Sequence, residues 1–288
     1  GLRDLVDATA FKQMQLTVLD GVTQVAQSAL ATWWTNNVAA LPNNSSNGNA
    51  LIVLDSVDDD GAGPDQSYPS NTIFTLATSR ASSGYQLVGD RALVTLPGAT
   101  LSYSGRAATN WDDGIGVGTS ARRCLIIAHD WLPWIEGVFD SEGGANDAHD
   151  GFCGKWTYGA RFNQATFTNS LYEGIFLYYN GQRKFTNVTV SNSGLDGIRI
   201  EVSNARDEMI DVTSNYSGGK GVNLNYCNGP DRGAKITRLN LTSNTNGGID
   251  TYQCHNSILD QVKSVGSGQS GIGVRGNQIV VMNSRSAN

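Results

Sequence analysis

A glycine followed by an apolar residue, a variable residue and a second apolar residue recurs through the C-terminal half of the chain. The anchor glycines are Gly174, Gly197, Gly221, Gly248 and Gly271. They are separated by 23, 24, 27 and 23 residues. Self-similarity with a period of roughly 20–50 residues is the signature of repeat architectures, so this pattern limits the possible folds more than any other feature.

A second apolar segment lies between successive anchors. These segments are Phe185–Val190, Met209–Thr213, Ile236–Leu241, Ile258–Val262 and Ile279–Met282. Each period therefore holds two or three short strands with their turns, and leaves no room for the crossover helix that parallel strands normally require. A β-sandwich, with strands about every 8–12 residues, would impose no such fixed period. The pattern instead predicts an all-β chain in which each strand pairs with its counterpart one coil later, a parallel β-solenoid.

The repeat also predicts which residues point inward. Positions one and three after each anchor are apolar in nearly every coil, as in Ile198 and Ile200, so we expect them to form the core. Position six holds a column of small residues: Asn180, Ser203, Cys227, Cys254 and Asn277. Stacked strands lie ~4.8 Å apart, which brings Cys227 within reach of a disulfide with Cys254. We nevertheless expect two free, half-buried thiols.

The N-terminal part does not follow the repeat. Residues 8–34 carry apolar side chains at three- to five-residue spacing after Asp7, a residue type that caps helices, which predicts an amphipathic helix. We expect three segments: 1–41, with this helix as a solenoid cap or as a trimerisation or virion-docking segment; 42–110, a β-rich module or irregular first coils; and 111–288, the β-helix with an inserted loop near 138–158.

Charge and composition exclude several classes of protein. The net charge is −6 and no run of Lys and Arg is present, so we expect no nucleic-acid partner. No apolar stretch approaches the roughly 18 residues that cross a bilayer, and no basic segment followed by an apolar one opens the chain, so we expect no membrane partner and no signal peptide. The four cysteines lack CxxC spacing and a histidine cluster, so we expect no metal and no cofactor.

Positions two and four after each anchor point away from the core of such a solenoid. They are Phe176 and Tyr178, Arg199 and Glu201, Asn223 and Asn225, Asp250 and Tyr252, and Gly273 and Arg275. The residue before the anchor adds Glu173, Asp196 and Lys220. Stacking turns these residues into one strip of aromatic, acidic, amide and cationic groups, the set of groups that binds sugars. A solvated face is the alternative, but clustered exposed aromatic residues usually mark a binding site.

Four carboxylates of this strip are candidate catalytic residues. Glycoside hydrolysis uses two carboxyl groups roughly 5–9.5 Å apart. Glu173 and Asp196 share a register position on adjacent coils, where the proximity of two carboxylates raises one of the two pKa values. Glu201 and Asp250 lie two coils apart, at about 10 Å. A lyase would instead need a base beside charge-neutralising groups, for which the cations of the strip are available.

The segment 129–158 is a second candidate for a ligand site. It contains two of the three histidines and three tryptophans, Trp131, Trp134 and Trp156. An anchor-like glycine at Gly137 breaks the period of the repeat, so we expect a loop to leave the solenoid here. Long loops on regular scaffolds often carry function, so the expected binding site is a cleft between this loop and the strip. Packing of the tryptophans onto the solenoid is the alternative.

The Gly-Ile-x-Ile coils with their Ser-Asn turns resemble the right-handed parallel β-helices of the pectate-lyase-like superfamily over about residues 112–285. The stretch WDDGIGVG at 111–118 is similar to the Asp-Asp-Gly element of polygalacturonases, matching Asp112 and Asp113. The Gly-His-Gly and Arg-Ile-Lys motifs of that family do not occur in this sequence. The resemblance therefore implies the fold and not hydrolysis of polygalacturonan.

A helix-led N-terminus and coils rich in Asn, Ser and Gly are more similar to a phage tail spike than to a secreted cell-wall enzyme. That resemblance implies a homotrimer in the virion tail, made in the host cytoplasm, that contacts other tail proteins. It also implies binding, and often cleavage, of a bacterial surface polysaccharide. Two alternatives stay open: a free secreted polysaccharide lyase or hydrolase of the same fold, and a structural or adhesive solenoid without an active site.

Overall fold

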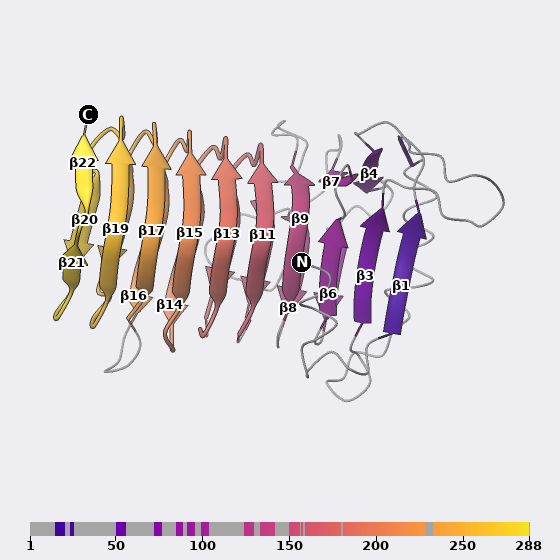
Figure 1. Ribbon diagram of the computed structural model, residues 1–288, viewed down its shortest axis with the longest axis horizontal. Coiled ribbons are helices and arrows are strands. Elements are labelled where there is room, and N and C mark those ends of the chain that lie inside the picture. Colours follow the sequence, from indigo (N-terminus) through magenta and orange to yellow (C-terminus); the bar gives the residue numbers. More distant parts are fainter. Residues whose placement is uncertain are drawn as a thin grey trace, which may run out of the picture.

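The computed structural model describes residues 15–20, 24–25, 50–55, 72–76, 85–88, 91–95, 99–103, 124–129, 133–141, 150–155, 157, 159–179, 181–227 and 233–287. The regular structure in these residues is β-strand, in two sheets that wind together as a right-handed parallel β-helix (Figure 1). Successive coils advance along one axis, from the N-terminal strands at one end to the C-terminal strands at the other. Within this part of the chain, no helix is long and apolar enough to cross a membrane.

The larger sheet has fourteen strands. Its main path follows β1 (Gln15–Asp20), β3 (Ala50–Asp55), β6 (Arg91–Thr95), β9 (Trp134–Asp140), β11 (Arg161–Thr168), β13 (Lys184–Ser191), β15 (Glu208–Asn215), β17 (Lys235–Thr242), β19 (Ile258–Val265) and β21 (Val280–Met282). Beside this path lie β2 (Gln24–Val25), β4 (Thr72–Leu76), β7 (Ala99–Tyr103) and β22 (Arg285–Ala287). The smaller sheet has eight strands in the order β20 (Ile272–Arg275), β18 (Gly247–Tyr252), β16 (Lys220–Cys227), β14 (Ile198–Ser203), β12 (Ile175–Tyr178), β10 (Asp150–Lys155), β8 (Cys124–His129) and β5 (Tyr85–Val88).

A single coil shows how the sequence builds the stack. The strand β14 lies in the eight-stranded sheet, β15 lies in the fourteen-stranded sheet, and β16 begins the next coil. Ile198 and Ile200 pair in parallel with Val222 and Leu224 of that next coil, and all four side chains are at most 1% exposed. The predicted core positions are therefore confirmed here. In β20 they are not, since β20 ends its sheet within the described strands and leaves Val274 42% exposed.

Left-handed backbone positions bend the chain at the same place in successive coils. One such column lies within the long strands of the fourteen-stranded sheet, with φ of 48° at Gln164, 54° at Asn187, 55° at Asp211, 57° at Arg238 and 55° at Gln261. Residues other than glycine adopt this conformation only rarely. At each bend the inward-outward alternation changes phase, as between the buried Phe162 and Ala165. One strand thereby covers two sides of the core.

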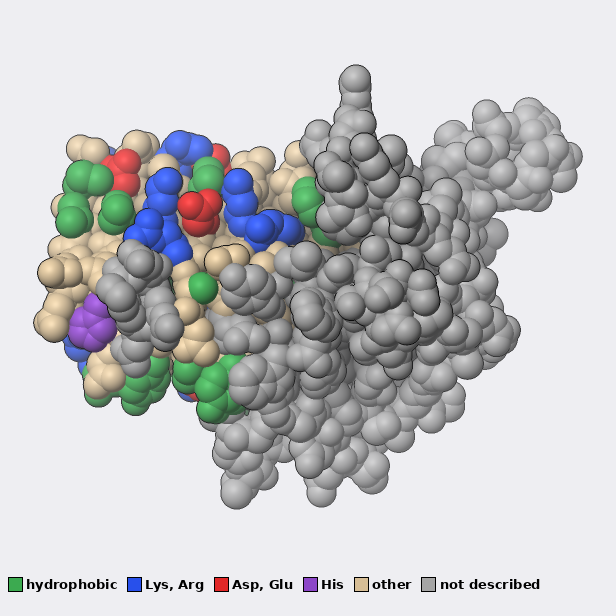
Figure 2. All heavy atoms as spheres, turned by 90° about the horizontal axis from the view of Figure 1, so that it is seen from below, with side chains coloured by type: hydrophobic (Ala, Val, Ile, Leu, Met, Phe, Trp, Pro, Cys, Tyr) green, Lys and Arg blue, Asp and Glu red, His purple; other side chains and the backbone are tan. Residues whose placement is uncertain are grey.

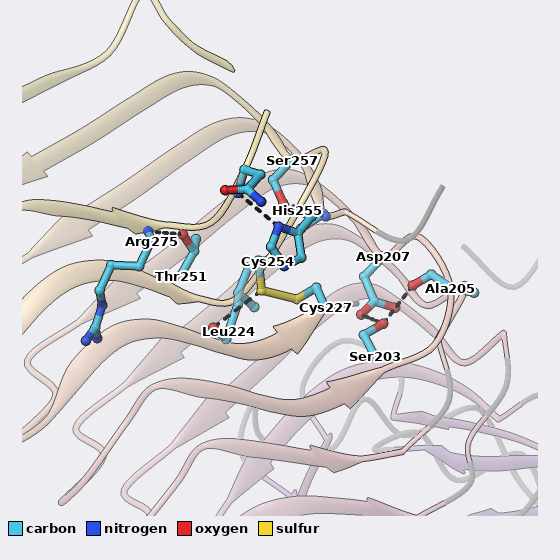
Figure 3. The surroundings of a disulfide bond; sticks show 12 residues. Ser203, Ala205, Asp207, Leu224, Cys227, Thr251, Cys254, His255, Ser257 and Arg275 are labelled. Carbon is cyan, nitrogen blue, oxygen red and sulfur yellow. Dashed lines mark hydrogen bonds between the residues drawn. A yellow bond between two sulfur atoms is a disulfide. The ribbon is translucent and has the colours of Figure 1, made fainter. Parts of the chain in front are cut away.

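Both pairs of cysteines form disulfides, so our expectation of free thiols is wrong. Cys227 and Cys254 lie on adjacent coils with Cα atoms 4.2 Å apart, and Figure 3 shows their bond next to Ser203, which pairs with Cys227. The second bond links Cys124 in β8 to Cys153 in β10, with Cα atoms 5.9 Å apart. Cys227 and Cys254 each follow a paired residue, Asn225 and Tyr252, by two positions, so parallel stacking brings their sulfur atoms together. Cys124 and Cys153 are not register partners, since Cys124 pairs with Asp150 and Cys153 with Ile127.

A buried ion pair ties neighbouring turns together. Arg183 is fully buried, and its Nε and Nη2 atoms donate to Oδ1 and Oδ2 of Asp207 at 3.0 and 2.9 Å. The backbone N–H of Arg183 donates to Oδ1 at 3.0 Å, and the hydroxyl of Ser203 donates to Oδ2 at 2.8 Å (Figure 3). This bidentate, charge-assisted geometry compensates the two groups for their removal from water.

The amphipathic helix expected over residues 8–34 is wrong where the structure describes that segment. Residues 15–20 and 24–25 form β1 and β2, and the rest of the segment lies outside the described residues. The strand β1 pairs in parallel with β3 over its whole length. Its sequence, QLTVLD, suits a strand as well as a helical face because it combines apolar with β-branched residues. A short apolar segment is compatible with both a helix and a strand. Here the pairing with β3 makes it a strand.

Gly137 is not an anchor of the repeat. It lies in β9 of the fourteen-stranded sheet with a φ of 113° and pairs with Ala165 of β11. The coil before β10 is supplied by β8, where Asp150 pairs with Cys124, 26 residues earlier. The apparent break in the period therefore comes from a glycine of the other sheet. The strands β9 and β10 cover residues 138–140 and 150–155 of the segment 138–158. The domain boundaries and the loop stay predictions.

Candidate functional site

The outward-facing residues of the eight-stranded sheet stack in register, as the repeat predicted. One column pairs Phe176, Arg199, Asn223, Asp250 and Gly273 across β12, β14, β16, β18 and β20. The second column pairs Tyr178, Glu201, Asn225, Tyr252 and Arg275 across the same strands. Together with Glu173, Asp196 and Lys220, which precede the anchors, these residues are the outer strip.

Arg199 is the centre of one ion-pair cluster in the outer strip. Its Nη1 atom lies 3.1 Å from Oε1 of Glu173, and its Nε atom donates to Oε1 of Glu201 at 2.8 Å. Its guanidinium also lies over the ring of Phe176, 5.9 Å from the centroid. Burial alone would lower the pKa of Arg199, but the two carboxylates outweigh burial and raise it. We call Glu173, Arg199 and Glu201 the Arg199 cluster.

Asp250 is the centre of a second cluster. Nζ of Lys220 and Nη2 of Arg275 each lie 2.5 Å from its Oδ2, and Nε of Arg275 donates to Oδ1 at 3.3 Å. Burial alone would raise the pKa of Asp250, but the hydrogen bonds from the two cations outweigh burial and lower it. The guanidinium of Arg275 lies over the ring of Tyr252, 4.9 Å from the centroid. We call Lys220, Asp250 and Arg275 the Asp250 cluster.

Asp196 lies between the two clusters and is only 8% exposed. Its Oδ1 accepts the backbone N–H of Lys220 at 2.8 Å, and its Oδ2 accepts an amide N–H of Asn223 at 2.7 Å. Burial raises the pKa of Asp196 above its ordinary value and the charge of Glu173 adds to the rise, against the opposing effect of the two hydrogen bonds and of Arg199. Of Asp196 and Asp250, Asp196 is therefore the one better suited to carry a proton.

The amide oxygen of Asn223 has no partner among the described residues. Asn223 is 8% exposed, and its Oδ1 atom is buried without a hydrogen bond in that part of the chain. Buried acceptors are almost always satisfied by protein or water. A hydroxyl group of a ligand or a water molecule donating to this atom would complete its hydrogen bonding.

Two of the predicted site residues have no access to solvent. Phe176 is 0% exposed and packs with Cys124, Cys153 and Tyr178, so it cannot stack on a ligand as we expected. Phe176 lies in the outward column, as predicted. At this end of the sheet, however, neighbouring side chains cover the outward face. Glu173 is likewise 0% exposed. It holds Arg199 and, in this conformation, cannot touch a substrate itself.

Trp134, the one predicted tryptophan that lies within the described residues, is not part of the outer strip. Trp134 lies at the start of β9 in the fourteen-stranded sheet, where its indole N–H donates to Glu136 at 3.2 Å. It therefore does not lie in a loop beside the eight-stranded sheet, as we expected. Trp131 and Trp156 lie outside the described residues, as do Asp112 and Asp113.

Two tyrosines and one acid that contact this region were not among the predicted site residues. Tyr179 lies 4.1 Å from Tyr178, and Tyr226 lies 5.4 Å from Tyr252, measured between ring centroids. Both missed tyrosines have a φ of 58° and occupy the same corner of their coils. The hydrogen bond with Tyr179, together with burial, raises the pKa of Tyr178 to about 12. Both tyrosines are the fifth residue after an anchor glycine, and this shared position was the available signal. In a regular strand the fifth residue would point toward the core, but the chain bends at this position.

The missed acid is Asp150, which is fully buried. Its Oδ1 accepts the backbone N–H of Glu173 at 2.9 Å, 23 residues later. Its Oδ2 lies 3.8 and 3.6 Å from the sulfur atoms of Cys124 and Cys153. These three residues have the chemistry of a metal site, but thiolates and not disulfide sulfurs are the ligands of metals, and the disulfide thus excludes this use. The 23-residue interval from Asp150 to Glu173 was the available signal.

A hollow of about 480 Å³ adjoins the Asp250 cluster. Its lining includes Lys220, Asp250 and Arg275 together with three uncharged polar residues, Asn246, Gln269 and Ser270. The strands β16, β18 and β20 position the three charged side chains. The outer strip therefore ends in a polar cavity at its C-terminal end.

A separate group of charges lies where the long strands begin. Figure 2 looks at that side of the molecule and shows Lys and Arg side chains gathered beside Asp and Glu. Arg161, Lys184, Glu208 and Lys235 share one register position there. Arg161 donates to the carbonyl oxygens of Gly159 and Gln182, both at 2.7 Å, and burial lowers its pKa. These contacts connect turns of adjacent coils, which is a structural role.

No protein-family model matches the chain, and no curated protein matches its sequence. Among solved structures, the A-module of the mannuronan C-5 epimerase AlgE4 from Azotobacter vinelandii is similar, with a TM-score of 0.52 and 12% identity. The match covers 92% of this chain and 74% of that one. The chain shares the parallel β-helix fold of that module. At this identity the similarity concerns the fold alone.

Two further structures match less closely. ORF18 of Geobacillus virus E2 has a TM-score of 0.33 and 11% identity, over 91% of this chain and 58% of that one. The surface protein and adhesin PfbA of Streptococcus pneumoniae has a TM-score of 0.33 and 9% identity, over 94% of this chain and 98% of that one. These scores are too low to support an inference about this chain.

Proposed function

We propose that the protein is a phage tail spike that binds a bacterial surface polysaccharide along the outer strip and depolymerises it. The observation that carries the proposal is the stacking of aromatic, cationic, acidic and amide side chains in register over five successive coils. At ~4.8 Å per coil, β12 and β20 lie about 19 Å apart along the stack. A linear glycan can lie along a surface of this length and meet the same kinds of groups repeatedly.

The chemistry of the strip suits sugar hydroxyls. Tyr252, held edge-to-face by Tyr226, offers a ring to an apolar sugar face. Glu201 and Asp250 are fixed by cations and accept hydrogen bonds, while Asn223 supplies a buried amide oxygen. Similarity to a fold that carries a mannuronan epimerase supports an activity on a polysaccharide. The tail-spike part of the proposal rests on the resemblance of the repeat and its turns.

For cleavage, Asp196 is the proposed proton donor because its pKa is raised. Asp250, whose pKa is lowered, remains a carboxylate and binds hydroxyls. Glu173 positions Arg199 against Glu201. Of the four predicted catalytic residues, only Asp196 thus keeps a catalytic role. The other three carboxylates bind the substrate or position the side chains around it.

The test incubates the full chain with capsule and lipopolysaccharide preparations from a panel of bacteria. Binding is measured by biolayer interferometry, and cleavage by new reducing ends or 4,5-unsaturated sugars, which separate hydrolysis from elimination. We expect Tyr252→Ala to abolish most binding, whereas Tyr216→Ala, at a tyrosine that is 60% exposed outside the strip, should leave binding unchanged. Asp196→Asn should stop cleavage while binding persists.

Several results would contradict the proposal. Equal losses in both tyrosine variants would show that the outer strip is not the binding surface. Undiminished cleavage by Asp196→Asn would exclude Asp196 as the proton donor. A monomer in size-exclusion chromatography with light scattering would refute the homotrimer that the tail-spike reading implies.

A further inference from the structure

The two ends of the outer strip differ in charge. The Arg199 cluster holds two carboxyl groups and one cation, and Asp196 lies between it and the Asp250 cluster. The Asp250 cluster holds two cations on one carboxylate. Because the pKa of Asp250 is lowered, this carboxylate stays ionised at neutral pH and the cluster keeps an excess of one positive charge. The C-terminal end of the strip is therefore its cationic end.

The two cations of the Asp250 cluster have donors to spare. An ammonium group carries three N–H donors and a guanidinium carries five. Within the described residues, the side chain of Lys220 makes one hydrogen bond, and that of Arg275 donates from Nε and Nη2. All of these bonds go to Asp250. Two N–H groups of Lys220 and the Nη1 side of Arg275 therefore remain for a ligand.

The two cations lie at the edge of the hollow beside them. Lys220 and Arg275 both line the cavity of about 480 Å³, and the side chain of Arg275 is 58% exposed. The ring of Tyr252 under the guanidinium restricts its orientation. Asn246, Gln269 and Ser270 add uncharged polar groups to the lining, which also includes Ile249 and Val274. An anion with neighbouring hydroxyls matches this set of groups.

We propose that the hollow binds an anionic substituent of the polysaccharide, a uronic-acid carboxylate or a phosphate ester. This inference rests on the proposed function of the outer strip and names the class of glycan that it selects. Lys220 and Arg275 donate to the oxygens of the anion, in the charge-assisted geometry that Arg offers to carboxylates and phosphates. The amide and hydroxyl side chains bind the hydroxyls of the same sugar. An uncharged glycan would leave the excess positive charge uncompensated.

The experiment divides a polysaccharide that binds the full chain into three portions. One stays native, one is reduced with carbodiimide and borohydride, which converts carboxyl groups to alcohols, and one is treated with hydrogen fluoride, which removes phosphodiesters. We expect one treatment to weaken binding by about tenfold or more, the effect of losing a charge-assisted hydrogen bond. Which treatment does so identifies the anion. Equal affinity for all three portions would overturn the inference while leaving the proposed function intact.

Matched variants locate the effect. Lys220→Met and Arg275→Gln should each weaken the native glycan about tenfold and leave the affinity for the anion-depleted glycan unchanged. Arg238→Gln is the control, because Arg238 makes a similar pair with Asp211 away from the strip, with Nη2 2.6 Å from Oδ2. Arg275→Lys keeps the positive charge and should therefore bind the native glycan more tightly than Arg275→Gln does. Equal losses for native and depleted glycan would overturn the inference, and absence of binding to every polysaccharide would overturn the proposed function with it.

Discussion

Replacing Arg183 by methionine should destabilise the protein by about 3–5 kcal/mol, the cost of breaking a buried ion pair from one side. Asp207 is 2% exposed and accepts hydrogen bonds from the guanidinium, from the backbone N–H of residue 183 and from the hydroxyl of Ser203. Methionine has a similar length but no charge. The substitution therefore leaves a carboxylate in the interior with two neutral donors and no cation.

Removing both charges should cost less than removing one. In the double variant Arg183→Met/Asp207→Leu no charge is buried, and Ser203 keeps its hydrogen bond to the carbonyl oxygen of Ala205 at 2.7 Å. The backbone N–H of residue 183 does lose its acceptor, which costs about 1–3 kcal/mol. We therefore expect the double variant to be about 2 kcal/mol more stable than Arg183→Met.

Urea unfolding followed by far-ultraviolet circular dichroism, with the disulfides intact, measures both effects. Equal m-values are required for the comparison, since a changed slope would mean a changed transition. The reasoning fails if Arg183→Met loses less than about 1 kcal/mol, which is the scale of an exposed ion pair. It also fails if the double variant is no more stable than the single one, because the cost would then lie in packing and not in charge.

Four further predictions concern two carboxylates, a disulfide and a glycine of the repeat. The pKa of Asp196 is raised in the folded state, so its contribution to the free energy of unfolding is present below the unfolded pKa of about 3.9 and is lost as the pH rises through the folded pKa. Asp196→Asn should therefore gain stability relative to the parent protein above about pH 4. The pKa of Asp250 is lowered, so this carboxylate stabilises the fold at neutral pH and stops doing so as the pH falls. Asp250→Asn should therefore be less stable than the parent protein at neutral pH and approach the parent's stability below about pH 4. Urea unfolding measured at several pH values across this range tests both variants. Cys227→Ser/Cys254→Ser should cost about 3.5 kcal/mol for a sequence separation of 27, and an unchanged melting temperature would refute the constraint. Gly197→Ala should cost about 1–3 kcal/mol, because a Cβ there would lie 2.6 Å from a carbonyl oxygen of the next coil, and a variant with parental stability would show that the coils can separate.

Periodicity predicted the fold because one residue pattern serves every coil. Ile198 and its equivalents are buried by the coils on either side, so a local pattern and its long-range partner carry the same information. At the N-terminus, QLTVLD has no repeat to align with, and it pairs with β3 instead of forming the expected helix. Gly137 resembles an anchor glycine in sequence but belongs to the other sheet. Without a repeated partner, a short apolar pattern does not distinguish the two structures.

For the candidate site, the sequence determined the register and the order of the groups along the strip. It could not determine their exposure or their partners. Phe176 and Tyr252 occupy equivalent outward faces, yet one is fully buried and the other half-buried. Glu201 and Asp250 were one proposed pair, but each is bound to cations of its own cluster.

The sequence by itself thus determined a β-solenoid, its core positions and the composition of its outward face, because these depend on a periodicity that a linear sequence contains. Only the tertiary structure decided which carboxyl group has a raised pKa, which cation has unused donors and which thiols form disulfides. These properties depend on side-chain rotamers, burial and distances between coils. A charged side chain reaches across more than one strand spacing, as Lys220 does to Asp250, and its choice among several partners within reach is made in three dimensions.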